Sequence, residues 1–181
     1  VPNETIAPDP ARFPWERQPR VIDDGTVRPA DHVIVTSPLP QTFSLLADSG
    51  IDLNLDLMRT QYDRTICLLA VLDSNAPLPP AGGVQPTDGI FGFIGDNRSK
   101  GVSTMPALTF HATGEWSEAH WEDHNDQLGA LLIEGAQPWL GDAVIVDHQV
   151  KKWRFATPRT IWPAPCWSSP DGSLTFAGDA F

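Results

Sequence analysis

Cysteine is scarce in this chain, and that scarcity excludes two common kinds of small domain. The 181 residues include only Cys67 and Cys166, with no CxxC or Cys/His pattern, so neither a disulfide framework nor a zinc site is indicated. Cys67 falls within an apolar run, which predicts a buried thiol, whereas Cys166 falls in a segment rich in tryptophan and proline. This usage fits a reducing, cytoplasmic setting.

Long apolar runs are also absent. No stretch approaches the roughly 20 apolar residues that a membrane-spanning helix needs, so no membrane partner is expected. The N-terminus, Val1-Pro2-Asn3-Glu4, has neither the basic start nor the apolar run of a signal peptide. Because it does not begin with methionine, we expect that the chain was processed, trimmed or taken from something longer.

Basic residues are outnumbered by acidic ones. Twelve lysines and arginines stand against 23 aspartates and glutamates, which gives a net charge of -11. Phosphates would be repelled over most of such a surface, which argues against nucleic acid as a partner. The acidic balance is typical of a soluble protein, and a small-molecule ligand is the expected partner.

The fingerprints of nucleotide binding are missing as well. The segment Gly89–Gly95 has the spacing GxxGxxG with bulky apolar residues between the glycines, which indicates a strand with close neighbours and not a dinucleotide loop. No GxGxxG segment, P-loop, GxSxG or convincing Ser/His/Asp set occurs. By its own residues, the polypeptide has no visible means of gripping a dinucleotide, and hydrolase chemistry has little support.

His120 and His124 lie four residues apart on an expected helix, a spacing that could seat a metal ion. Trp121 and Asp123, however, occupy the positions where zinc peptidase motifs require glutamate. A surface or packing role for the two histidines is favoured, and no metal site is predicted.

The remaining pattern predicts an α+β domain with a largely antiparallel sheet and flanking helices. Residues 1–20 contain five prolines and predict an irregular arm, and residues 21–181 predict one domain. Expected strands include 31–36, 62–72, 90–94, 107–112, 143–156 and 173–177. Expected helices are 41–47 and a longer one from Ser117, as its cap, to about residue 134.

Three residues on the expected strands are candidates for a ligand site. His111 lies in an apolar strand and needs a partner there, whether structural or catalytic. Trp153 could form a flat wall over a planar ring, although core packing explains it equally well. Arg154 follows it directly.

Five segments stand out: residues 30–41, 96–101, 108–112 with Trp116-Ser117, 153–158 and 177–181. They occur in the order found in renalase-like FAD-dependent amine oxidoreductases, of the flavin-containing amine oxidase type. Each is weak alone, but together they resemble that family over some 155 residues, from about residue 25 onward. The segment Ala177-Gly178-Asp179-Ala180-Phe181 resembles the family's C-terminal flavin-contacting motif.

The resemblance implies the substrate domain of a two-domain flavoprotein, in which an antiparallel sheet roofs the flavin ring. Such enzymes oxidise a small reduced substrate, either a dihydronicotinamide dinucleotide or an amine, and pass the electrons to dioxygen. By resemblance, Pro38, Gly178 and Asp179 would contact FAD. His111, Trp153 and Arg154 would belong to the substrate-facing sheet, with one reservation: alternate residues of a strand face opposite sides, so Trp153 and Arg154 are not expected to face one pocket together.

The chain departs from the family in two places. The N-terminal strand-turn-helix that grips the FAD pyrophosphate is missing, and so is the helix after Asp179. Most of the FAD site would therefore lie in a domain outside this chain, and we expect the isolated chain to bind FAD weakly or not at all and to be inactive. The alternative is a stand-alone, non-catalytic binding or interaction domain that has lost the FAD domain.

Overall fold

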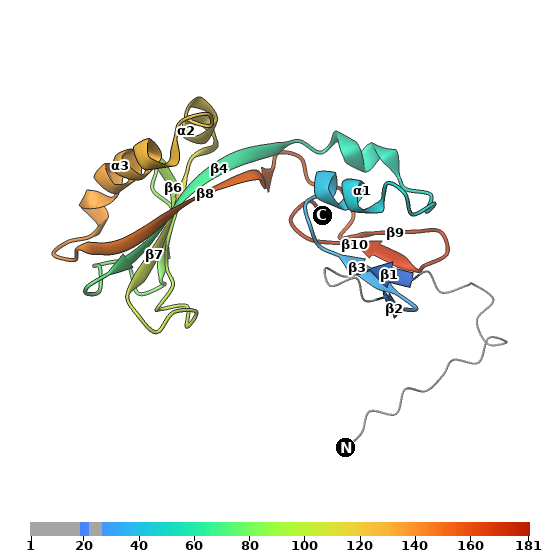
Figure 1. Cartoon of the computed structure of the whole chain (residues 1–181), viewed down its shortest axis with the longest axis horizontal. Coiled ribbons are helices and arrows are strands. Elements are labelled where there is room, and N and C mark those ends of the chain that lie inside the picture. The colour runs from blue at the N-terminus through green and yellow to red at the C-terminus, as the bar shows by residue number, and fades with distance from the viewer. Residues whose placement is uncertain (1–18, 22–26) are drawn as a thin grey trace, which may run out of the picture.

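The chain forms two lobes joined by a pair of long strands (Figure 1). The structure is a computed structural model that describes residues 19–21 and 27–181. The larger lobe contains a five-stranded sheet with two helices, and the smaller lobe contains short strands, one helix and both ends of the described chain. The predicted Pro-rich arm, residues 1–20, lies outside the described residues apart from 19 and 20.

The sheet of the larger lobe has the order β5-β6-β7-β4-β8, and every neighbouring pair is antiparallel. Strands β5, β6 and β7 follow one another through short connections, whereas β4 pairs with β7 and β8 across longer ones. The strands are β4 (Tyr62–Leu72), β5 (Gly83–Val84), β6 (Phe91–Asp96), β7 (Ala107–Ala112) and β8 (Ile145–Pro158).

Helices cover one face of this sheet. Helices α2 (Gly114–Ala119) and α3 (Asn125–Ala136), followed by the 3-10 turn η2 (Gln137–Trp139), lie on the same side of β4 and β8 (Figure 1). Leu128 and Leu132, part of the predicted apolar stripe of the helix, are fully buried there against Ile66, Leu68 and Phe110. The opposite face carries no helix, and it is the face on which the candidate site lies.

The single helix predicted from Ser117 to about residue 134 is in fact two helices. Thr113 caps α2, because its side chain accepts a hydrogen bond from the Trp116 amide. Ser117 lies inside α2, fully buried, and accepts a hydrogen bond from the Ile66 amide of β4 at 2.9 Å. Because Thr113 already caps α2, the Ser117 hydroxyl was free to bond with the distant strand β4.

The smaller lobe has its own apolar cluster, formed by Leu39, Phe43, Leu46, Leu57, Leu174, Phe176 and Ala180. Its three-stranded sheet has the order β3-β10-β9, with β10 (Leu174–Phe176) parallel to β3 (Val33–Val35) and antiparallel to β9 (Trp167–Ser168). Helix α1 (Leu39–Leu46) begins with proline in its first turn, where a missing amide costs nothing. The lobe also holds β1 (Pro19–Val21), β2 (Val27–Pro29) and the 3-10 turn η1 (Leu55–Arg59).

Strands β4 and β8 run from one lobe to the other as a two-stranded ribbon (Figure 1). The ribbon is fixed near the smaller lobe by an edge-to-face contact between Tyr62 and Phe155, with ring centroids 5.9 Å apart. An ion pair between Arg159 Nε and Asp63 Oδ1, at 2.6 Å, lies beside it. The two lobes are thus joined by a paired ribbon, interrupted by a bulge between Asp63 and Thr65, rather than by a loose linker.

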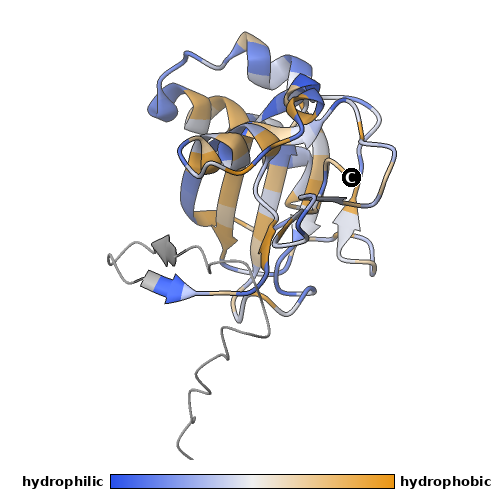
Figure 2. Cartoon of the chain, turned by 90° about the vertical axis from the view of Figure 1, so that its right-hand side faces the viewer, coloured by the Kyte–Doolittle hydropathy of each residue, from blue (hydrophilic) through white to orange (hydrophobic). Residues whose placement is uncertain are grey.

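The predicted fold class is confirmed: the chain is α+β with a five-stranded antiparallel sheet and few helices. Figure 2 shows the apolar residues concentrated on the strands and on the helix faces that meet them. The predicted strand 31–36 is shorter than expected, and Ile34 at its centre is 65% exposed, so this strand is not buried on both faces. Among the described residues, no helix has the length and apolar content to cross a bilayer.

Candidate functional site

The carboxyl ends of the two parallel strands β3 and β10 meet beside the ribbon. Ligands of open parallel sheets bind outside the carboxyl ends of the strands, because loops diverge there and leave a crevice. Here a cavity of about 70 Å³, which we call the strand-end cavity, opens between them. It is lined by Thr36, Ser37, Pro38, Tyr62, Phe155, Ala156, Ala177, Asp179, Ala180 and Phe181.

Tyr62 organises this cavity. Its hydroxyl accepts a hydrogen bond from the Leu39 amide at 3.0 Å, which fixes the start of α1 against the ribbon. Burial raises the pKa of the Tyr62 phenol, the bond from Leu39 opposes that rise, and the nearby Asp179 charge adds to it. The phenol therefore stays protonated at neutral pH and has a proton to donate toward the cavity.

Gly178 serves close backbone packing in the structure. Its φ of +121° is one that side-chain-bearing residues rarely adopt, and a Cβ there would lie 3.2 Å from the Thr36 carbonyl oxygen. The glycine therefore lets the end of β10 approach the end of β3. It thereby positions the next residue, Asp179, whose exposed side chain lines the cavity.

A second and larger cavity adjoins the first. This sheet cavity has a volume of about 540 Å³, within the range of about 300–1,000 Å³ typical of small-molecule sites. Pro38, Phe155 and Ala156 line both cavities, so the two share a wall. The other lining residues are Gln41, Thr65, His111, Lys152, Trp153, Arg154 and Thr157.

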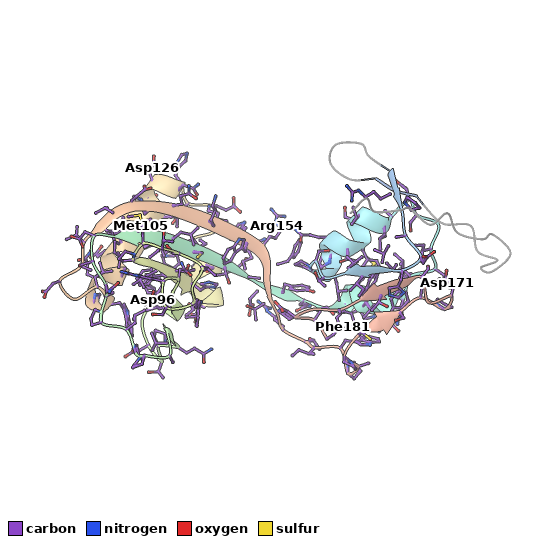
Figure 3. All side chains as sticks on the ribbon, turned by 90° about the horizontal axis from the view of Figure 1, so that it is seen from below. Asp96, Met105, Asp126, Arg154, Asp171 and Phe181 are labelled. Atoms are coloured by element: carbon purple, nitrogen blue, oxygen red, sulfur yellow. The ribbon has the colours of Figure 1, made fainter. Side chains whose placement is uncertain are left out.

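A bulge in β8 interrupts the strand alternation beside Trp153 and Arg154, both of which line the sheet cavity. Thr65 of β4 pairs with Trp153 and Asp63 with Thr157, so three residues of β8 stand opposite the single residue Arg64. A bulge of this kind re-aims side chains and bends the strand. Figure 3 shows Arg154 where β8 bends out of the larger lobe toward the lobe that carries Phe181.

Aromatic rings form a row across the uncovered face of the large sheet. The His111 ring centroid lies 5.2 Å from that of Trp153 and 5.5 Å from that of Phe93, the latter in edge-to-face geometry. The Lys100 ammonium lies 5.0 Å from the Phe93 ring centroid, a cation–π distance. This aromatic row, Phe93–His111–Trp153, leads from β6 across the sheet to the sheet cavity.

His111 is held neutral in this row. Its pKa is lowered from 6.5, first by burial and second by the charge of Lys100. Because the unfolded chain takes up this proton at a higher pH than the folded chain, stability is full above about pH 6.5 and falls as the pH drops below it. At neutral pH the ring can accept one hydrogen bond and donate another.

We expect the His111 ring proton to titrate with a midpoint below 6.5 in an NMR pH series. Replacing Lys100 by glutamine should raise the midpoint, yet leave it below 6.5, since burial is the larger cause. The matched control is Arg59→Gln, which removes one charge from η1 in the other lobe and should leave the midpoint unchanged. A midpoint at or above 6.5 in the unmodified chain would contradict the assigned burial.

Cys67 lies on the same face but is no nucleophile. It stands opposite His111 on one side and Lys151 on the other in the strand register. The predicted burial of its thiol is confirmed, since Cys67 is fully buried. That burial raises the pKa of Cys67 to about 12, so the thiolate is not formed at neutral pH.

His120 and His124, the two histidines of the helical segment, do not form a joint site in the structure: His120 contacts its near neighbours and His124 is exposed. His120 Nδ1 lies 2.7 Å from Asp123 Oδ2, and its ring stacks on Trp116 at 4.3 Å. His124 is exposed at the residue before α3. Both lie on the helix-covered side of the sheet, away from the two cavities.

The structure gathers most of the predicted site residues in one region. Pro38, His111, Trp153 and Arg154 line the sheet cavity, and Asp179 lines the adjoining strand-end cavity, whereas Gly178 lines neither. Sequence reasoning missed Phe93, Lys100, Tyr62 and Phe155. The available signal for the last two was weak: one aromatic residue near the start of β4 and one near the end of β8, which the antiparallel pairing brings together.

The sequence matches no protein-family model and no curated protein. Solved structures that resemble the fold include a proposed protoporphyrinogen oxidase from Exiguobacterium sp. 255-15, with a TM-score of 0.51 and 13% identity over 87% of this chain and 38% of that chain. They also include a Pyrococcus furiosus protein (TM-score 0.47, 11% identity, 88% of this chain and 37% of that one). A third is iminodiacetate oxidase from Chelativorans sp. BNC1 (TM-score 0.43, 15% identity, 91% and 43%).

At these identities the likeness concerns the fold alone. The chain spans less than half the length of each of these proteins. Two of the three carry oxidase names, and the chain has the fold of part of the first of them.

Proposed function

We propose that this chain is the substrate-side part of a FAD-dependent oxidoreductase of the renalase-like, amine oxidase type, with the aromatic row facing the substrate. One observation carries the proposal: the strand-end cavity and the sheet cavity share Pro38, Phe155 and Ala156. A flavin whose ribityl chain lies at the ends of β3 and β10 would thus place its ring in the sheet cavity, beside a substrate on the large sheet. The shared fold with part of an oxidase structure supports the same arrangement.

The residues fit the ring side of a flavin but not its pyrophosphate. The sheet cavity has the volume and the flat aromatic wall that a planar ring needs. The start of α1, by contrast, offers no free amide for a phosphate: Leu39 donates to Tyr62, Pro40 has no N–H, and Gln41 and Thr42 donate to the Pro38 carbonyl. The pyrophosphate contacts would therefore come from a second domain, in line with the absence of a GxGxxG segment.

A bound flavin would supply the redox chemistry, taking a hydride from a reduced substrate and passing two electrons to dioxygen. The residues of this chain would bind and orient. Pro38 would lie against the flavin edge, and Asp179, beside Gly178, would accept hydrogen bonds from ribityl hydroxyls. Trp153 and His111 would hold the substrate ring over the cofactor, and Arg154 would fix its polar end.

The proposal predicts weak binding of the flavin ring and ribityl chain, with no added affinity from the pyrophosphate and adenosine of FAD. In fluorescence titrations, the chain should quench riboflavin and FAD with similar, weak affinities, because only the ring and ribityl chain find partners here. Trp153→Leu should weaken the binding of both flavins, whereas Val146→Ala, an exposed apolar change at the far end of the same strand, should not.

Two other outcomes would contradict the proposal. FAD that binds far more tightly than riboflavin and survives gel filtration would mean that the chain grips the pyrophosphate by itself. Failure of either flavin to bind saturably would favour the alternative, a non-catalytic binding domain that has lost the chemistry.

A further inference from the structure

Lys100 and Lys151 lie on or beside the uncovered face of the large sheet, and Arg154 lines the sheet cavity there, although the chain as a whole is strongly acidic. All three lysines of the chain, Lys100, Lys151 and Lys152, belong to this sheet or to the turn beside it. Arg154 adds a fourth cation at the bulge.

Three of the four cations lack a carboxylate partner. In the part of the chain that the structure describes, no ion pair involves Lys100, Lys151 or Arg154. The nearby carboxylates are engaged elsewhere: Asp96 accepts from the Ser99 hydroxyl and from two amides of its own turn, and Asp63 pairs with Arg159.

Lys152 shows what a structural lysine looks like in the same strand. Its side chain points to the helix-covered side, where Nζ donates to the carbonyls of Trp121 at 2.6 Å and Asp123 at 2.8 Å. Those bonds join β8 to the segment between α2 and α3. Lys100, Lys151 and Arg154 are exposed and carry no such bonds; Lys100 contacts the Phe93 ring, and no ion pair or hydrogen bond among the described residues accounts for the positions of Lys151 and Arg154.

The unpaired cations frame the aromatic row. Lys100 lies over Phe93 at one end of the row, and Arg154 follows Trp153 at the other. Lys151 faces the same side as His111, because both stand opposite Cys67 in the register of the sheet. Flat rings in the middle and cations at the ends complement a flat ligand that carries negative charge at its edge.

We propose that this face binds a planar organic anion, an aromatic or conjugated ring system bearing a carboxylate or a similar acidic group. The ring lies along Trp153 and His111, and the acidic group meets the Arg154 guanidinium, whose planar fork suits a carboxylate. Calling this ligand the substrate rests on the proposed function, but its binding does not. Of the two substrate classes that the family resemblance implies, the charge pattern disfavours a free amine, because an ammonium ion would be repelled by the same cations.

The test uses three probes of nearly equal shape and different charge: naphthoate, the neutral naphthamide, and naphthylmethylammonium. Each is titrated into the chain without flavin, and the His111 ring proton and backbone amides are followed by NMR. Naphthoate should bind saturably, with shifts at His111, Trp153 and Arg154. Naphthamide should bind more weakly and the ammonium probe least, and the difference should shrink at about 1 M salt, where charges are screened beyond ~3 Å.

Variants identify the residues responsible. Arg154→Gln and Lys151→Gln should each weaken naphthoate roughly two- to fivefold, as expected for exposed ion pairs, and leave naphthamide unchanged. Arg59→Gln is the matched control, since its side chain is 85% exposed and lies in the other lobe, yet the change removes the same charge. Equal affinity for all three probes, equal effects of the control and Arg154 variants, or no saturable binding would overturn the proposal. Failure of flavin to bind would overturn only the proposed function.

Discussion

Replacing Phe110 by alanine is expected to destabilise the larger lobe by about 3–5 kcal/mol, the usual cost of removing a buried phenylalanine from a core. Phe110 is fully buried in the main apolar cluster, and its ring lies 5.0 Å from that of Phe91. The sheet on one side and α3 on the other limit how far the site can collapse around the cavity. Urea denaturation should show a lower midpoint with an unchanged slope.

The control for Phe110 comes from the neighbouring strand. Phe93 is also a phenylalanine, but it lies on the uncovered face and is only partly buried. Phe93→Ala should therefore cost clearly less stability than Phe110→Ala, although it removes the same atoms. Equal losses would mean that the uncovered face is packed as tightly as the core, and the assignment of that face as a ligand surface would fail.

Sequence periodicity predicted the elements that depend on local burial. The apolar run 62–72 is a strand between β7 and β8 whose side chains on the helix-covered face are buried. Leu128 and Leu132 are at helical spacing because one face of α3 packs on that sheet. Periodicity could not predict the break between α2 and α3. Ser117 satisfies a strand amide 51 residues away, and no local pattern records such a partner.

The candidate site was predictable residue by residue but not as a surface. His111 stood out because an apolar strand is an unusual place for an imidazole, and Trp153 because a flat ring preceded a recognisable motif. Their contact depends on β4 lying between β7 and β8, which is a property of strand order. The bulge beside Arg154 is likewise set by pairing with β4, and alternation along β8 alone does not record it.

The chain has two separate apolar clusters, one in each lobe. Strands β4 and β8 carry backbone pairing from lobe to lobe, but the buried side chains divide into two sets. The strand-end cavity lies beside the smaller set, and the aromatic row lies on the sheet face opposite the larger set. The position of the strand-end cavity relative to the sheet cavity therefore depends on the ribbon of β4 and β8. The contact between the Tyr62 and Phe155 rings stiffens that ribbon.

Phe176→Ala is the second large effect that we expect, and it should be confined to the smaller lobe. Phe176 is 1% exposed and packs on Phe43, with ring centroids 6.1 Å apart, and on Trp167 at 4.9 Å. Its loss from a cluster of only seven buried residues should cost that lobe about 3–5 kcal/mol. Such a loss is large enough to open the lobe locally while the large sheet stays folded.

Hydrogen exchange separates this outcome from global unfolding. In Phe176→Ala, the amides of Val33 and Ala177, which bond to Ser173 and Val35 across the parallel strands, should lose protection, whereas amides paired between β4 and β7 should keep it. Phe110→Ala should give the reverse order, with the large sheet losing protection first. If both variants lower protection equally in both lobes, the ribbon makes the chain one cooperative unit. Flavin and substrate surfaces could then not be loosened separately, and every change at one cavity would be felt at the other.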